Sequence, residues 1–275
     1  MSIPSTPMIE SVILRHSGRG MDLLYPHVLP NFCEDAAKYI ASWPKGNIFL
    51  LTGFYVAGYA ETDGPLGTLV LADALQKMGY TPYIITDKYC KDFFENYIEH
   101  IIYAPIDAKT DYYEQLIEQY QPVGMISIER CGRNSQDDYA NMRGISIAND
   151  TAALDELFIL AKSKKIPTVG IGDGGNEIGM GNLSHIIRNQ LSLVPCEIGA
   201  DKLVIATISN WGAYGLACYL GQMTSQTYMY TFETLKKYLA YIVSLGSVDG
   251  VFKENVMSID GFPLSVEEEI VNALQ

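Results

Sequence analysis

The sequence predicts an α/β fold, in which a mostly parallel β-sheet is flanked by helices and an acid-lined site lies at the carboxyl ends of the strands. Three observations predict it. Short apolar runs alternate along the chain with helical patterns, which is typical of parallel sheets covered on both faces. Several of these runs end in an acidic residue. The 275 residues are 48% hydrophobic, which is enough to bury a sizeable core.

Five nearly continuous runs of Val, Ile, Leu or Met have the composition of buried strands. They are residues 47–53, 81–87, 123–129, 167–173 and 202–209. The runs are not separated by a linker and do not repeat one another. The sequence therefore predicts a single domain over residues 1–275.

Helical patterns separate these runs. Residues 65–78 open with Pro65, which suits a first helical turn, and stop before a glycine. Residues 151–165 follow Asp150 as an expected N-cap and end in lysines, which suit a helix C-terminus. The other expected helices cover residues 91–101, 110–120, 182–192, 211–222, 228–244 and 265–274. The first thirty residues and the last thirty are less regular.

Composition excludes several classes of protein. The net charge of −13, from 32 acids and 19 bases, argues against a nucleic-acid surface. No apolar run is long enough to cross a membrane, and the N-terminus lacks the basic region of a signal peptide. The five cysteines are odd in number and form no CxxC pair, which indicates reduced thiols. We therefore expect a cytoplasmic protein that binds neither nucleic acid nor membrane.

Acidic residues follow the predicted strands. Because ligands bind outside the carboxyl ends of parallel strands, these acids are expected to converge. Oxygen ligands without histidine or cysteine suit Mg²⁺ or Mn²⁺, and all four histidines lie outside the acidic motifs. The candidate metal ligands are Glu61, Asp63, Asp87, Glu129, Asp173 and Glu177. The alternative is neutralisation by ion pairs with Arg130, Arg133 or Arg143.

The segment GIGDGGNEIGMGN, residues 170–182, has six glycines around Asp173 and Glu177. Glycines permit tight turns and a close approach of the backbone to a cation and its substrate. GIGDGG also matches the dinucleotide-binding pattern GxGxxG, but both carboxylates would repel a pyrophosphate. Asp63 has a simpler interpretation too, as the N-cap of the helix that starts at Pro65.

Three of these acids are the candidate catalytic residues: Glu129, Asp173 and Glu177. A guanidinium such as that of Arg130 or Arg133 suits a substrate carboxylate. In NWGAYGL, residues 210–216, Asn210 and Trp211 are interpreted either as a wall of the substrate pocket, with Asn210 donating to a carboxylate, or as a buried Trp whose N–H is satisfied. The candidate substrate-binding residues are Arg130, Arg133, Asn176, Ser209, Asn210 and Trp211.

Several segments together resemble the D-glutamate cyclase C-terminal domain family over roughly residues 15–270. They are GRGM, TGFYVAGYAETDGPLGT, ISIERCGRNSQDDYANMRG, GIGDGGNEIGMGN, SNWGAYGLA and SIDGFPL. The resemblance implies a lyase that cyclises D-glutamate, or a close analogue, to 5-oxo-D-proline with loss of water.

The same parts would also serve a metal-dependent, phosphatase-like hydrolase of a small metabolite, or a metal-dependent protein that only binds a small acid. In each case the expected partner is a small acidic molecule. The aromatic helix over residues 227–243 is interpreted as core or as a subunit interface, so a homo-oligomer is possible.

Overall fold

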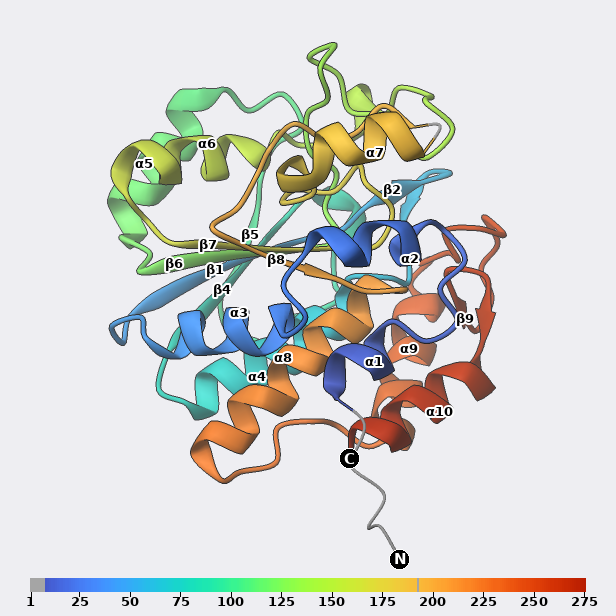
Figure 1. Cartoon of the computed structure of the whole chain (residues 1–275). Coiled ribbons are helices and arrows are strands. Elements are labelled where there is room, and N and C mark those ends of the chain that lie inside the picture. Colours follow the sequence, from blue (N-terminus) through green and yellow to red (C-terminus); the bar gives the residue numbers. More distant parts are fainter. Residues whose placement is uncertain (1–7, 192) are drawn as a thin grey trace, which may run out of the picture.

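The computed structural model describes residues 8–191 and 193–275 (Figure 1). Its centre is a six-stranded sheet in the order β5–β4–β1–β6–β7–β8, and every neighbouring pair is parallel. The strands are β1 (Asn47–Thr52), β4 (Thr81–Thr86), β5 (Ile101–Tyr103), β6 (Gly124–Ile128), β7 (Thr168–Gly172) and β8 (Lys202–Ile205). Strand order reverses between β1 and β6, which is where open α/β sheets bind their ligands.

Helices cover both faces of this sheet, and the predicted fold class is confirmed. One face packs on α3 (Phe32–Ala41), α4 (Pro65–Lys77) and α8 (Ser209–Thr224), and the other on α5 (Thr110–Tyr120) and α6 (Asp155–Lys164) (Figure 1). The remaining helices are α1 (Ile9–Ile13), α2 (Met21–Leu24), α7 (Ser184–Gln190), α9 (Phe232–Ser244) and α10 (Leu264–Leu274). Two small hairpins complete the fold: β2 (Tyr55–Val56) with β3 (Tyr59–Ala60), and β9 (Ser258–Ile259) with β10 (Phe262–Pro263).

Most predicted elements are present. All five predicted strands and seven of the eight predicted helices form, although the expected helix over 182–192 is divided between a 3-10 turn (Gly181–Leu183) and α7. Residue 192 of that prediction and residues 1–7 of the N-terminus lie outside the described part of the chain. None of the helices in the described ranges combines the length and the apolar composition that crossing a bilayer demands.

The predicted helix over residues 91–101 is wrong. Residues 91–99 form consecutive turns, Asp92 has a positive φ of 68°, and Ile101 begins a strand that pairs with β4. The apolar spacing that suggested a helix has another cause. Phe94 and Tyr97 are anchored on Tyr238 of α9, with ring centroids 6.4 and 5.1 Å apart.

The predicted N-cap at Asp150 is also wrong, because that residue ends a separate 3-10 turn (Ala148–Asp150) and α6 starts at Asp155. The side chain of Asp150 accepts a hydrogen bond from the hydroxyl of Tyr89. The sequence pattern placed the helix start too early because both segments are rich in cap-forming residues.

Helices α4 and α8 cap one another. Neither N-cap residue provides a side-chain cap of its own. The carboxylate of Asp63, which precedes α4, accepts hydrogen bonds from the backbone N–H groups of Ser209 and Asn210, both at 2.8 Å. In return, the amide oxygen of Asn210 accepts from the N–H groups of Gly64 and Gly67 at 2.9 and 2.7 Å. Two N–H groups at the start of each helix, which have no acceptor within the helix, are thereby satisfied.

This exchange corrects two interpretations of the sequence. Asp63 caps α8 instead of the helix that follows it in the chain. Asn210 does not donate to a carboxylate, since its amide nitrogen donates to the carbonyl of Thr62 at 3.2 Å. Gly67 permits the close approach, because a Cβ atom there would lie 2.8 Å from that of Ala213.

We expect Asn210→Ala to destabilise the protein strongly. The substitution leaves the buried N–H of Gly67 without an acceptor, which costs about 1–3 kcal/mol, and leaves the N–H of Gly64 with Asp63 as its one remaining acceptor. The melting temperature should fall by about 3–10 °C. Asn189→Ala is the matched control, because Asn189 is exposed on α7. Equal melting temperatures for the two variants would contradict the mutual capping.

Candidate active site

Six acidic side chains gather at the carboxyl ends of β6 and β7 and beside them, and we call them the acid cluster. Glu129 follows β6 directly, and Asp173 follows β7. All six are at least nine-tenths buried. The acid cluster comprises Glu61, Asp63, Glu129, Asp173, Glu177 and Asp260.

The glycine-rich loop after β7 holds the side chain of Glu177 by backbone hydrogen bonds. The carboxylate of Glu177 folds back and accepts hydrogen bonds from the N–H groups of Gly174 and Gly175 at 2.8 and 2.7 Å. A Cβ atom on Gly174 would lie 2.8 Å from that carboxylate, and Gly175 has a φ of +125°. Glycine is required at both positions for these different reasons.

Glu129 has an unusual backbone conformation. Its φ of +46° lies in the left-handed region, which is uncommon for a residue other than glycine. Its carboxylate accepts a hydrogen bond from the hydroxyl of Ser209 at 2.6 Å. Ser209 therefore contacts a candidate catalytic residue, although it does not line the cavity described below.

Arg19 brings a positive charge into the acid cluster from the segment before α2. Its Nη2 atom donates to Asp173 and to Asp260, and more weakly to the carbonyl of Thr207 at 3.3 Å. Sequence reasoning assigned no site role to Arg19 or Asp260. The available signal was their position in GRGM and SIDGFPL, two of the segments that carry the family resemblance.

A cavity of about 450 Å³ opens onto the acid cluster. Its walls include the hairpin tip around Asn141–Ile147 and the loop around Gly250–Lys253. Five of the six acids line it, and Asp63 does not. It also contains three bases, Arg19, Arg143 and Lys253, and the amide of Asn176.

Several predicted site residues lie elsewhere. Asp87 is buried in an ion pair with Arg130 at 2.7 Å, and Arg130 also donates to the carbonyls of Gly53 and Ala152. The reason is topological: Asp87 follows β4, which lies on the far side of β1 from β6 and β7. The predicted ion pair with Arg130 therefore forms at Asp87, whereas Asp173 pairs with Arg19.

Arg133 and Trp211 also do not line the cavity. Arg133 pairs with Asp155 and Glu156 at the start of α6. Trp211 is fully buried, and its indole N–H donates to Glu267 at 2.6 Å. Of the two interpretations of Trp211, the structure therefore has the buried indole with a satisfied N–H. Asn210 is occupied by helix capping, as described above.

Burial and repulsion from neighbouring carboxylates raise the pKa values of four acids in the cluster. Burial, reinforced by Asp260, raises the pKa of Asp63 to about 7, despite its three backbone N–H donors. Burial also raises the pKa of Glu61, Glu129 and Asp173 well above the ordinary range, and for Asp173 the charge of Arg19 offsets only part of this effect. Two like charges 4 Å apart repel by about 4 kcal/mol at an effective dielectric constant near 20.

The donor set fits a hard divalent cation. Two groups of three carboxylates each bring one oxygen per residue within 4.8 Å of the others: Asp63–Asp173–Asp260 and Glu129–Asp173–Glu177. Neither group contains histidine or cysteine, so the oxygens suit Mg²⁺ or Mn²⁺. Glu61, which lines the same cavity, is 6% exposed and has no side-chain hydrogen bond within the described residues.

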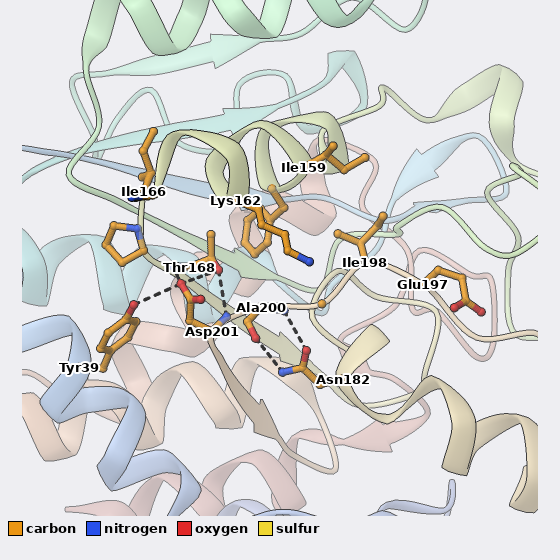
Figure 2. A pocket seen from close by; sticks show the side chains of 14 residues that line it. Tyr39, Ile159, Lys162, Ile166, Thr168, Asn182, Glu197, Ile198, Ala200 and Asp201 are labelled. Atoms are coloured by element: carbon orange, nitrogen blue, oxygen red, sulfur yellow. Dashed lines mark hydrogen bonds between the residues drawn. The ribbon is translucent and has the colours of Figure 1, made fainter.

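A second pocket, of about 720 Å³, lies at the opposite end of the sheet, where β7 and β8 begin. Figure 2 shows hydrogen bonds among several of its polar residues, whereas Lys162 and Glu197 have none to the residues drawn. Asp201 accepts from Thr168 and Tyr39, and Asn182 bonds to the backbone of Ala200. Neither group of three carboxylates lies in this pocket, so the acid-lined cavity is the stronger candidate for an active site.

Comparison with known proteins identifies the family. Residues 9–275 match the family described as D-glutamate cyclase-like, C-terminal. The chain belongs to this family. It is also 33% identical over 184 residues to the human protein named D-glutamate cyclase, mitochondrial. That match covers 58% of this chain and 29% of the human protein, so the chain spans less than a third of its relative.

Solved structures add only a distant likeness to this D-glutamate cyclase-like chain. A UDP-glucose 4-epimerase from Brucella ovis in complex with NAD is 12% identical, with a TM-score of 0.32, over 66% of this chain and 47% of its own. The E. coli tRNA N6-threonylcarbamoyladenosine dehydratase TcdA in complex with AMP is 11% identical, with a TM-score of 0.31, over 70% and 90%. Similarity at this level carries no information on activity.

We expect the cation-free protein to lose stability as pH rises from about 4 to 7. In this range the folded chain holds protons on Asp63 and Glu129 that the unfolded chain has already released. The free energy of unfolding must then decrease with pH. Buried Asp155 and Glu267, whose pKa values are also raised, act in the same direction. Melting temperatures in chelator between pH 5 and 8 test this, and a rise over that range would contradict it.

Proposed function

We propose that this chain is a divalent-cation-dependent lyase that cyclises D-glutamate, or a close analogue, to 5-oxo-D-proline with loss of water. The observation that carries the proposal is the acid cluster at the base of a cavity that also contains bases, in a member of the D-glutamate cyclase-like family. The name of the human relative supports the substrate, and the oxygen-only donor set supports Mg²⁺ or Mn²⁺.

The reaction joins two ends of one small molecule. The α-amine attacks the γ-carboxyl carbon, a C–N bond forms and a C–O bond breaks. The departing oxygen leaves as water with the two protons that the ammonium gives up, so no other reactant is needed. A bound cation would supply Lewis-acid polarisation of the γ-carboxyl group.

The chain's own residues have distinct parts in this proposal. Arg143 and Lys253 form no ion pair within the described residues, so they are available to attract and hold a substrate carboxylate. A carboxylate of the cavity that does not hold the cation accepts a proton from the ammonium as general base, and Glu61, which belongs to neither group of three, is placed for this role. The cavity holds the flexible substrate in a folded conformation, which brings the nitrogen within reach of the carbonyl carbon.

Glu129→Gln should have opposite effects on stability without and with cation. In chelator, removing a buried, repelled carboxylate should raise the melting temperature by about 2–4 °C. With saturating Mn²⁺ the order should reverse, because binding at about 100 times Kd stabilises only the wild type by about 2.7 kcal/mol. Glu118→Gln, exposed on α5, is the control with the same chemical change. Parallel curves that never cross would contradict cation binding by Glu129.

The activity itself is tested by chromatography. Protein with Mn²⁺ and D-glutamate should form the lactam, whereas L-glutamate should react more slowly. Asp173→Asn should lower the rate by at least about a hundredfold. A generic aryl phosphate is offered in parallel. Phosphate release without lactam would overturn the lyase and favour the hydrolase alternative, and neither product would favour a protein that only binds a small acid.

A further inference from the structure

The two groups of three carboxylates in the acid cluster share one residue. They differ in the hydrogen-bond donors that already contact them. Asp173 belongs to both groups. One group adds Asp63 and Asp260, and the other adds Glu129 and Glu177. If both were free, the site would suit a pair of cations bridged by Asp173, as in two-metal enzymes.

The first group already has a partner for each of its members. Asp63 accepts three backbone N–H groups, from Gly64, Ser209 and Asn210. Asp173 and Asp260 both accept from the same Nη2 atom of Arg19. A guanidinium keeps its charge at any physiological pH, so it cannot leave this group by losing a proton.

The second group has only neutral partners besides the shared Asp173. Glu129 accepts from the Ser209 hydroxyl, and Glu177 accepts from the backbone of Gly174 and Gly175. These bonds orient the two carboxylates without neutralising them. Glu61 lines the same cavity, is buried, and has no side-chain hydrogen bond to residues 8–191 or 193–275.

We infer that Arg19 is a built-in cation that fills the Asp63–Asp173–Asp260 group, and that the chain therefore binds a single divalent cation, at Glu129–Asp173–Glu177. The inference takes its cation from the proposed function and adds the stoichiometry, the site and the role of Arg19. One oxygen of Asp173 then accepts from the guanidinium, and the same carboxylate is also a ligand of the divalent cation. The side chain of Arg19 is 30% exposed, and its Nε and Nη1 atoms donate to no described residue, so these donors are available to a carboxylate in the cavity.

The test counts cations. Mn²⁺ alone is titrated into chelator-treated protein by calorimetry, and bound Mn²⁺ is counted independently by electron paramagnetic resonance. Wild type should bind one ion per chain. Arg19→Met, which keeps the length and removes the charge, should bind two, and Arg19→Lys should again bind one. Arg143→Met removes a charge from the same cavity without freeing a carboxylate, so it should bind one.

Substitutions of the acids identify which group is used. Asp260→Asn should leave wild-type affinity for Mn²⁺ within about threefold, whereas Glu177→Gln should weaken it by at least about tenfold. Asp260→Asn in the Arg19→Met background should abolish the second ion. These two acid substitutions decide the matter even where Arg19→Met does not fold.

The inference is overturned by two ions in wild type, by no ion in wild type, by one ion in a folded Arg19→Met variant, or by a tenfold loss of affinity in Asp260→Asn. Lactam formation is measured separately, so a protein that binds one ion at the assigned group and makes no lactam would refute the proposed reaction and leave the role of Arg19 intact.

Discussion

Electrostatic repulsion among six buried carboxyl groups is the constraint on which the structure around the candidate active site depends. Among the described residues, one counter-charge contacts the acid cluster, the partly exposed guanidinium of Arg19, and water is largely excluded from the acids themselves. A fold that only had to be stable would not keep such a group, because each charged carboxylate without compensation costs several kcal/mol when buried. Burial accordingly raises the pKa values of Glu61, Glu129 and Asp173 well above the ordinary range.

The surrounding structure is built to hold the acids in place against that repulsion. Backbone N–H groups donate hydrogen bonds to Glu177 in the glycine-rich loop and to Asp63 at the start of α8. The exchange between Asp63 and Asn210 joins the acid cluster to the packing of α4 against α8, where Gly67 permits close contact. The geometry of the site is thus fixed by helix termini and a tight turn, which are among the most rigid elements available.

The sequence predicted the convergence of acids where each acid follows a strand that borders the acid cluster. Glu129, Asp173 and Glu177 follow the parallel strands β6 and β7, and they converge because these two strands are neighbours in the sheet. Asp87 also follows a strand, but the strand order places β4 beyond β1, and the acid pairs with Arg130 instead. Strand order is set by which helices pack on which face, and no local pattern records it.

What the sequence by itself determined is the α/β class, five of the six strands of the main sheet and most of the helices, because apolar periodicity and helix-end residues are local properties. The strand at Ile101–Tyr103 was not predicted, because the apolar residues that precede it are spaced as in a helix. Only the tertiary structure decided that Arg19 and Asp260, from opposite ends of the chain, meet at Asp173. It also decided that Asp63 and Asn210 cap each other's helices, since hydrogen bonds between residues more than a hundred positions apart depend on packing that no short segment specifies.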